Sequence, residues 1–180
     1  MNGKERILQA AEKHFGARPY NDVSIAPILL DAEVQPPTLY YHFRDKEGLY
    51  VAWVETTFAP LSGHLKIGRA ATVEDGLAAF AAIYFNVVKF DVQQVVRDID
   101  QLSRDNSKET VYGAYFQAIY EPLCAILIEG TEKGELATGP IGPVADLYLA
   151  GLFMLHAKTE QDLAGTAVWF AKRFLRGHHA

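Results

Sequence analysis

The sequence has little of several features that would point to particular classes of protein. It contains one cysteine, Cys124, so no disulfide can form within the chain, and a reducing compartment is expected. No apolar run reaches the roughly 18 residues that a membrane-spanning helix needs. The first fifteen residues mix charged with apolar positions, unlike a secretory signal. We therefore expect a cytoplasmic protein with no membrane partner.

Positive charge is also scarce. The formal net charge is −5, and residues 1–50 carry six lysines and arginines against seven acidic residues. No basic stripe exists of the kind that dominates non-specific binding to nucleic acid. A DNA-binding protein of this composition would depend on a few well-placed cations and hydroxyl groups. Its affinity should fall only modestly as salt is added.

Catalytic motifs are missing. The six histidines form no HExxH or similar metal-ligand spacing, and the chain has no glycine-rich phosphate loop and no G-x-S-x-G sequence. Cys124 lies in an apolar helical stretch, where a thiol is expected to be buried and unreactive. The sequence thus predicts no catalytic residue, no metal site and no cofactor, and we expect the protein not to be an enzyme.

Strand patterns are almost absent, because alternation of apolar and polar residues never lasts beyond four positions. With 49% hydrophobic and 22% charged residues, the composition is that of a soluble globular protein. The fold class expected is all-α with about nine helices. They are expected near residues 4–15, from a cap at Ser24, at 36–43, from 46 to 60 or beyond, after Thr72, near 92–102, and at 108–133, 144–158 and 162–176.

Three features of the second half of the chain predict how its helices bend, end and pack. Pro122 should kink the long helix, because proline cannot donate a hydrogen bond to residue 118. Gly134 should end that helix. The last two helices are apolar nearly all round, so one side is expected to cover the core and the other a second copy of the chain. The residues predicted at this dimer interface are Leu149, Leu152, Phe153, Val168, Trp169, Phe170 and Phe174.

Residues 24–46 are the chemically specific part of the chain. They predict a helix, a tight turn and a short second helix, which is the helix-turn-helix geometry that places the second helix in the major groove of DNA. Leu39 and Phe43 should face the core. The other side chains of the short helix suit base edges, thymine methyl groups and phosphates. Those predicted to face outward or sideways are Gln35, Pro36, Pro37, Thr38, Tyr41 and His42.

Lys46 begins the following helix, where the helix dipole disfavours a cation. A phosphate docked there would make the same lysine a useful contact. By pattern alone, the segment 40–42 could equally be the surface of an ordinary amphipathic helix.

The string Thr38-Leu39-Tyr40-Tyr41-His42-Phe43, followed by Lys46-Glu47 and Leu49, resembles the signature of TetR-type transcriptional regulators. The resemblance extends upstream to the segments 15–16, 20 and 24, and more weakly downstream to 134–136. It implies a DNA-binding domain at 1–48 and an effector-binding and dimerisation domain at 49–180. It also implies a homodimer that reads a palindromic operator. The DNA-binding residues are then Ser24, Gln35, Pro36, Pro37, Thr38, Tyr40, Tyr41, His42 and Lys46.

The larger domain resembles the effector-binding region of that family, where a pocket between helices is expected. Aromatic walls with hydroxyl groups suit a small molecule that is aromatic or largely apolar. Aromatic stripes at helical spacing are also what a simple core requires. The residues predicted to line the pocket are Tyr84, Val88, Leu102, Tyr112, Tyr115, Phe116, Tyr120 and His156.

Two residues depart from the family pattern. Glu33 stands where glycine is usual, so either Glu33 takes a positive φ or the turn differs. Asp45 stands where serine is common. The function expected is a ligand-responsive DNA-binding regulator, a repressor that a small molecule releases from its operator. The alternative is a dimeric helical small-molecule-binding protein of the same fold that no longer reads DNA.

Overall fold

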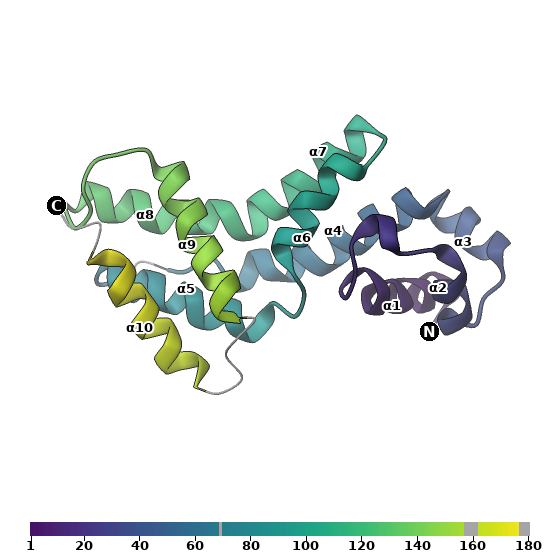
Figure 1. The fold of residues 1–180 in the computed structure, drawn as a ribbon, viewed down its shortest axis with the longest axis horizontal. Helices are drawn as coiled ribbons and strands as arrows, with labels where there is room; N and C mark the ends of the chain where they lie inside the picture. The colour runs from purple at the N-terminus through teal and green to yellow at the C-terminus, as the bar shows by residue number, and fades with distance from the viewer. Residues whose placement is uncertain (69, 157–161, 177–180) are drawn as a thin grey trace. The chain divides into compact units, whose positions relative to one another are not determined.

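A computed structural model describes residues 1–68, 70–156 and 162–176. These residues form α-helices, 3-10 turns and one π-helical turn, with no strand among them, which confirms the all-α prediction. Two compact units can be distinguished, and Figure 1 shows their helices. The first unit comprises residues 1–59 and 90–115, and the second comprises 60–89 and 116–180.

The first unit contains the predicted helix-turn-helix. Its elements are α1 (Gly3–Phe15), the 3-10 turn η1 (Tyr20–Asp22), α2 (Ile25–Ala32), α3 (Pro36–Phe43), most of α4 (Lys46–His64), α6 (Val92–Asp98), the 3-10 turn η2 (Ile99–Gln101) and α7 (Asp105–Tyr115). Both α2 and α3 pack against α1 (Figure 1). This unit extends beyond the predicted domain of residues 1–48, since it also takes in α6 and α7.

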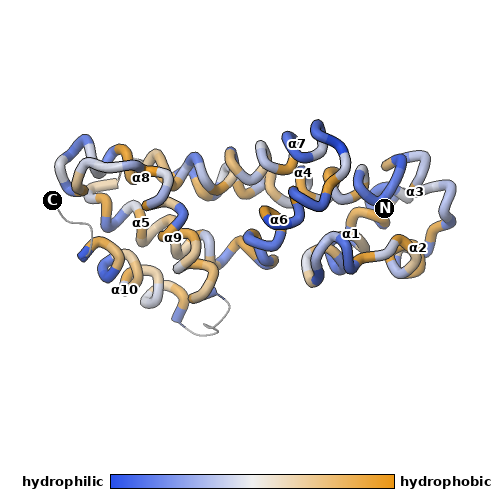
Figure 2. The backbone as a smooth tube through the Cα atoms, turned by 45° about the horizontal axis from the view of Figure 1, so that its top comes forward, coloured by the Kyte–Doolittle hydropathy of each residue, from blue (hydrophilic) through white to orange (hydrophobic). Residues whose placement is uncertain are grey.

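The second unit is built from longer apolar helices. Its elements are α5 (Val73–Val87), the π-helical turn η3 (Phe116–Tyr120), α8 (Glu121–Glu132), α9 (Ile141–His156) and α10 (Leu163–Leu175). Helix α5 packs against α8 and α10, and α8 packs against α9. Figure 2 shows that α9 is mainly hydrophobic and that α10 combines hydrophobic with hydrophilic positions.

Side-chain caps explain where several helices begin. Asn2 and Glu5 form a reciprocal capping box at the start of α1. The Thr72 hydroxyl accepts from the Asp75 amide at 3.1 Å, as expected for the cap of α5. Asp162 caps α10 by accepting from the Gly165 amide at 3.0 Å. Helix α9 starts at Ile141 rather than near residue 144, because Pro143 is tolerated in a first turn that needs no amide donor.

The long helix runs without a break from Asp105 to Glu132. Counting α7, η3 and α8 as one gives nine α-helices among the described residues, the number expected. Pro122 is accommodated by the π-helical turn at residues 116–120 immediately before it. This helix is long and apolar enough to cross a membrane by length and composition alone. A core helix passes the same test, and Ile119, Leu123 and Leu127 of this one are buried.

Each unit has an aromatic core. In the first, the Phe15 and Tyr50 rings meet edge to face at 5.0 Å, and Tyr50 lies 5.4 Å from Trp53, distances typical of favourable aromatic pairs. In the second, the Tyr148 ring stacks on Phe170 at 4.9 Å, and its hydroxyl donates to the Leu77 carbonyl at 2.8 Å. Burial raises the pKa of Tyr148, so this hydroxyl stays protonated and remains a donor.

Candidate nucleic-acid interface

The turn between α2 and α3 is tight despite the glutamate in it. Glu33 adopts φ 52° and ψ 45°, the left-handed conformation. The Glu33 amide donates to the Leu30 carbonyl at 3.1 Å and the Val34 amide to that of Leu29 at 3.2 Å. The first of the two expected alternatives therefore holds: the turn keeps a glycine-like geometry, at a cost of about 1 kcal/mol for a residue with a Cβ.

The N-terminus of α3 offers side chains rather than backbone donors. Gln35 is extended, and Pro36 and Pro37 occupy the first turn, where their missing N–H groups would lack an intrahelical partner in any case. The next amide, that of Thr38, donates to the Gln35 carbonyl at 3.0 Å. The groups that this helix end can offer to a ligand are therefore mainly side chains.

Helix α3 has one buried and one exposed face, as predicted. Leu39 and Phe43 are buried, whereas Tyr40 and Tyr41 are 53% and 85% exposed. The Tyr41 and His42 rings meet edge to face at 5.0 Å. Gln35, Pro36, Pro37 and His42 are exposed as well, and Thr38 is half-buried. The γ2 methyl of Thr38 lies against Gly3 of α1, since a Cβ built at Gly3 would approach it to 3.0 Å.

The N-terminus of α2 suits a phosphate. Ser24 is exposed and stands at the cap position, yet its hydroxyl accepts no hydrogen bond from the first turn. The amides of Ile25 and Ala26 belong to that first turn, whose N–H groups have no acceptor within the helix. A helix end of this kind attracts anions through its dipole and its amide groups. The Ser24 hydroxyl can add a further donor there.

Lys46 is held inside the unit rather than projecting into solvent. Its Nζ donates to the carbonyl oxygens of Tyr20 at 2.9 Å and Val23 at 3.1 Å. It also lies 4.1 Å from the centroid of the Tyr20 ring, within range of a cation–π interaction. Burial lowers the pKa of Lys46. Its charge therefore stands next to the start of α2, because Val23 directly precedes Ser24.

Arg44 is a candidate that the sequence pattern did not single out. It follows the last residue of α3 with φ 70°, and its side chain is exposed, with Nε 3.8 Å from the Asp45 carboxylate. An exposed guanidinium at the end of a recognition helix can reach a phosphate. The sequence signal was an arginine in the break between two helices, which reads as an ordinary turn residue.

The corner between α3 and α4 is fixed by Asp45. Its Oδ1 accepts from the Gly48 amide at 2.8 Å and so caps α4. The same carboxylate receives both terminal nitrogens of Arg104, Nη1 at 2.7 Å and Nη2 at 3.0 Å. Hydrogen bonding to Arg104 lowers the pKa of Asp45. Asp45 is thus neutralised by a guanidinium that is far away in the sequence.

Glu47 is a buried carboxylate beside this corner. It accepts from the backbone amides of Ser103 at 3.0 Å and Arg104 at 3.1 Å, and from the Arg104 Nε at 3.1 Å. Burial by itself would raise the pKa of Glu47, but the hydrogen bonds from Ser103, Ser107 and Arg104 outweigh it and lower the pKa to about 2. Glu47 is therefore ionised at neutral pH. Sequence reasoning did not find this network, because its two halves lie in separate segments.

A second buried carboxylate, Asp98, ties α6 to the same unit. It accepts from the Tyr20 amide at 3.0 Å and the Tyr50 hydroxyl at 3.1 Å. Burial raises the pKa of Tyr20 to about 12, with a further contribution from the Glu47 charge. The Lys46 ammonium group also lies against the Tyr20 ring. Contacts among Lys46, Tyr20 and Asp98 therefore connect α4, α6 and the segment before α2.

The residues predicted to line an effector pocket fall in both units. Tyr84, Val88, Phe116, Tyr120 and His156 belong to the second, whereas Leu102, Tyr112 and Tyr115 belong to the first. The His156 ring lies 6.0 Å from that of Tyr84 and stacks on Phe85 at 5.8 Å. The Tyr120 hydroxyl donates to the Gly142 carbonyl at 3.2 Å. Their roles remain predictions.

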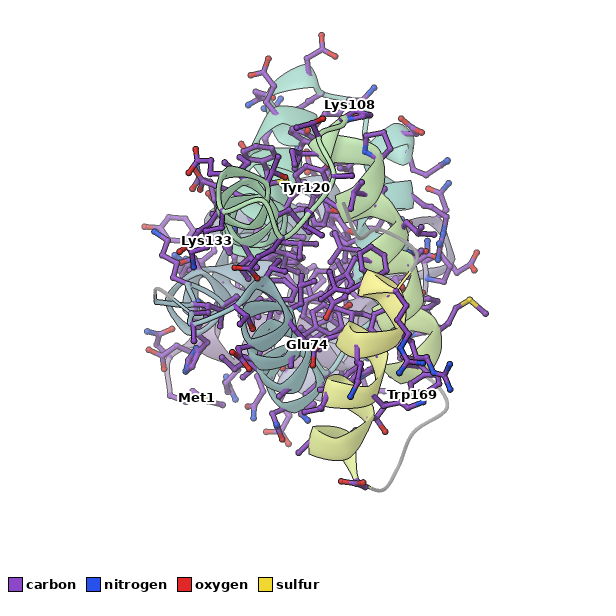
Figure 3. All side chains as sticks on the ribbon, turned by 90° about the vertical axis from the view of Figure 1, so that its left-hand side faces the viewer. Met1, Glu74, Lys108, Tyr120, Lys133 and Trp169 are labelled. Carbon is purple, nitrogen blue, oxygen red and sulfur yellow. The ribbon has the colours of Figure 1, made fainter. Side chains whose placement is uncertain are left out.

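The residues predicted at the dimer interface differ in how far their side chains are exposed to solvent. Leu149, Leu152 and Phe174 are buried in the core of the second unit, and Phe153 and Phe170 are partly covered. Val168 and Trp169 are each 53% exposed, and Figure 3 shows Trp169 on the outer side of α10. Leu147 and Met154 of α9 are also exposed. The surface available to a partner is therefore smaller than the predicted set and includes two further residues.

Comparison with known proteins agrees with this geometry. Residues 7–53 match the family model described as bacterial regulatory proteins, tetR family. The chain is 24% identical over 161 residues to the HTH-type transcriptional regulator BetI of Brucella anthropi, an alignment that covers 86% of this chain and 81% of that protein.

Solved structures show the same fold over nearly the whole chain. A regulatory protein of the tetR family from Rhodococcus RHA1 superposes with a TM-score of 0.79 at 15% identity, covering 100% of this chain and 98% of that one. FadR from Bacillus subtilis, solved in complex with stearoyl-CoA, gives 0.74 at 17% identity, covering 97% and 99%. The family is one of regulators and not of enzymes. The matched segment, with its exposed α3 in a helix-turn-helix, is similar to the DNA-binding part of the tetR family of bacterial regulatory proteins, and the chain has the fold of solved members of that family.

Proposed function

We propose that the protein is a cytoplasmic repressor that binds a palindromic operator as a homodimer and leaves it when a small molecule binds. The observation that carries this proposal is the exposed polar and aromatic face of α3, next to a corner where Asp45 and Glu47 both bond to Arg104. In a helix-turn-helix protein this face enters the major groove, and a dimer places two copies in successive grooves.

The side chains around α3 divide into two roles. Gln35 can pair with adenine, while Thr38 and the two prolines offer apolar contact to thymine. Tyr40, Tyr41 and His42 provide donors for phosphate or base edges. Ser24, with the first amides of α2, forms the phosphate site. Lys46 adds positive charge next to that site.

Dimerisation is proposed through α9 and α10. Val168 and Trp169 on α10, with Leu147 and Met154 on α9, expose large apolar side chains, and exposed apolar patches mark interaction surfaces. A second copy would cover these side chains with the same set of residues, as two-fold symmetry requires. The dimer in turn compensates for the weak positive charge of a single copy.

The effector is proposed to be a mainly apolar or aromatic molecule with a polar group. In the second unit His156 lies among the rings of Tyr84 and Phe85, and its Nδ1 is buried without a hydrogen-bond partner among the described residues. Burial lowers the pKa of His156, so a neutral imidazole would meet the ligand. The complex of FadR from Bacillus subtilis with stearoyl-CoA, a ligand with a long apolar chain, supports this proposal.

Footprinting on the DNA that flanks the protein's own gene tests the proposal. The purified protein should protect a palindromic segment, and Thr38→Ala or Tyr40→Ala should abolish the protection. Tyr112→Ala is the matched control, because Tyr112 is as exposed as Tyr40 but lies on α7. Equal loss of protection in the control and the α3 variants would contradict the assignment of α3.

A regulator-like binder that has lost DNA recognition is the second candidate. The acidic Glu33 side chain at the turn and the net charge of −5 favour it. In that case removing the charge of Glu33 would leave DNA binding unchanged, and no operator would emerge from any DNA library.

A further inference from the structure

We propose that Arg104 is a positioning residue for DNA recognition, which fixes the corner between α3 and α4, and so the direction of α3, without touching DNA itself. The proposal rests on DNA recognition through α3. It assigns part of the operator specificity to a residue that lies far from the helix-turn-helix in the sequence.

The corner is short and has few local constraints. It consists of Arg44, with φ 70°, and Asp45, whose amide donates to the Phe43 carbonyl at 2.8 Å. A non-glycine residue with positive φ persists only when its surroundings hold it. Local hydrogen bonds cap α4 through Asp45 but leave the angle of α3 to contacts from elsewhere.

Arg104 supplies those contacts as a two-sided clamp. Its terminal nitrogens grip the Asp45 carboxylate at 2.7 and 3.0 Å, and its Nε reaches Glu47 at 3.1 Å. A planar guanidinium bonded to two carboxylates fixes direction as well as distance. Lysine could neutralise the same charges, but its single ammonium group could not reproduce this arrangement of three planar donor nitrogens.

The clamp is anchored in the interior of the unit. Glu47 is only 6% exposed, and the amides of Ser103 and Arg104 hold it at 3.0 and 3.1 Å. Removing one member of a buried charge network leaves the others unpaired, which is costly. Loss of Arg104 would therefore release Asp45 from its position at the end of α3.

A direct phosphate contact is the competing role for an arginine in a DNA-binding unit. In this structure all three donor nitrogens of the Arg104 guanidinium already have carboxylate partners, and its side chain is 25% exposed. The two roles differ in their salt dependence. Each phosphate contact that is lost reduces the slope of log K against log salt by about 0.9, whereas a positioning residue leaves the slope unchanged.

The experiment compares Arg104→Gln with wild type and with the control Arg97→Gln. Arg97, on α6, carries the same charge and pairs at 3.1 Å with Asp91, the residue that caps α6, away from the corner. Fluorescence anisotropy would measure affinity for a duplex carrying the palindrome that wild type selects from random DNA, and for a scrambled duplex, across a salt series. Circular dichroism and sedimentation velocity would establish that each variant is folded and in the wild-type oligomeric state.

We expect Arg104→Gln to weaken selected-site binding about tenfold, the loss of about one base contact. Affinity for scrambled DNA and the salt slope should match Arg97→Gln. Equal loss on both duplexes with a shallower slope would overturn the proposal in favour of a phosphate contact, and unchanged site affinity would overturn it outright.

Two further measurements keep the test decisive. If Arg104→Gln does not fold, Arg104→Lys takes its place, with the same expected loss of specificity because charge without the planar donor nitrogens cannot hold Asp45. Retained specificity in that folded variant would overturn the proposal. Failure of wild type to select any site would instead refute the proposed operator binding, an outcome separate from every result for Arg104.

Discussion

The ammonium group of Lys46 links the start of α4 to the segment before α2. It donates to the Tyr20 carbonyl at 2.9 Å and lies 4.1 Å from the centroid of the same residue's ring. A second bond, to the Val23 carbonyl at 3.1 Å, ties it to the residue before Ser24. One lysine thus combines a structural role with the positive potential expected near a phosphate.

Replacing Lys46 should therefore affect stability as well as DNA binding. Lys46→Met removes two charge-assisted hydrogen bonds and takes the lysine donor from the Val23 carbonyl, whereas the Tyr20 carbonyl keeps the bond from the Val23 amide at 3.3 Å. We therefore expect the free energy of unfolding to fall by about 2 kcal/mol. Urea unfolding measures this change. Lys13→Met is the control: Lys13 is exposed and pairs with Asp31 at the surface, where a pair contributes about 0.5 kcal/mol. Equal effects of the two substitutions would contradict the structural role of Lys46.

Glu33 should lower stability through its left-handed backbone and weaken DNA binding because its carboxylate repels phosphates. Glu33→Gly relieves about 1 kcal/mol of left-handed strain. Part of this gain in stability is lost, because glycine has more conformational freedom in the unfolded chain. We expect a small net gain in thermal stability and tighter binding to any DNA, because an acid leaves the turn. Glu33→Gln separates the two effects: it should tighten DNA binding without the gain in stability. A stability gain for Glu33→Gln equal to that of Glu33→Gly would show that charge, not backbone strain, is responsible.

The buried Glu47 predicts a dependence of stability on pH. Its pKa is lowered to about 2, so its contribution is complete above the unfolded-state pKa of roughly 4.3. That contribution is lost as pH falls from there toward 2. It is on the order of 2 kcal/mol. Chemical unfolding at pH 6 and pH 3 should show a smaller loss for Glu47→Gln than for wild type.

The exposed Glu55 on the same helix supplies the control for this pH effect. Glu55→Gln should lose as much stability between pH 6 and pH 3 as wild type does. If Glu47→Gln also behaved like wild type, Glu47 would not be the group that titrates.

Local parts of the fold could be predicted from the sequence because local rules determine them. The spacing of Leu39 and Phe43 and the prolines in the first turn together defined α3. Thr72 and Gly134 marked their helix ends for the same reason. The exposed face of α3 follows from this periodicity alone.

Contacts between distant segments could not be predicted in this way. Arg104 stands in what reads as a break between helices, and its partners Asp45 and Glu47 lie 59 and 57 positions away. Lys46 read as a free cation at a helix start, but only the folded chain brings the Tyr20 carbonyl to it. Likewise, Pro122 predicted a kink, but the π-helical turn directly before it could not be predicted from the sequence.

The exposed apolar residues of α10 should be needed for self-association. Trp169→Glu places a charge on a side chain that is 53% exposed, so it should leave the fold intact and produce monomers in sedimentation velocity. Ile128→Glu is the control, since Ile128 is an exposed apolar residue on α8 of the same unit. Dimers that persist in Trp169→Glu at micromolar concentration would exclude this surface as the interface.

Selection of binding sites from random double-stranded DNA by the purified protein tests the central claim most directly. The account predicts enrichment of a palindrome whose half-sites lie about 10 base pairs apart, or a multiple of that distance. It also predicts that Tyr40→Ala loses this enrichment while Tyr112→Ala retains it. Recovery of no common sequence by the folded wild-type protein would contradict the claim that α3 reads DNA.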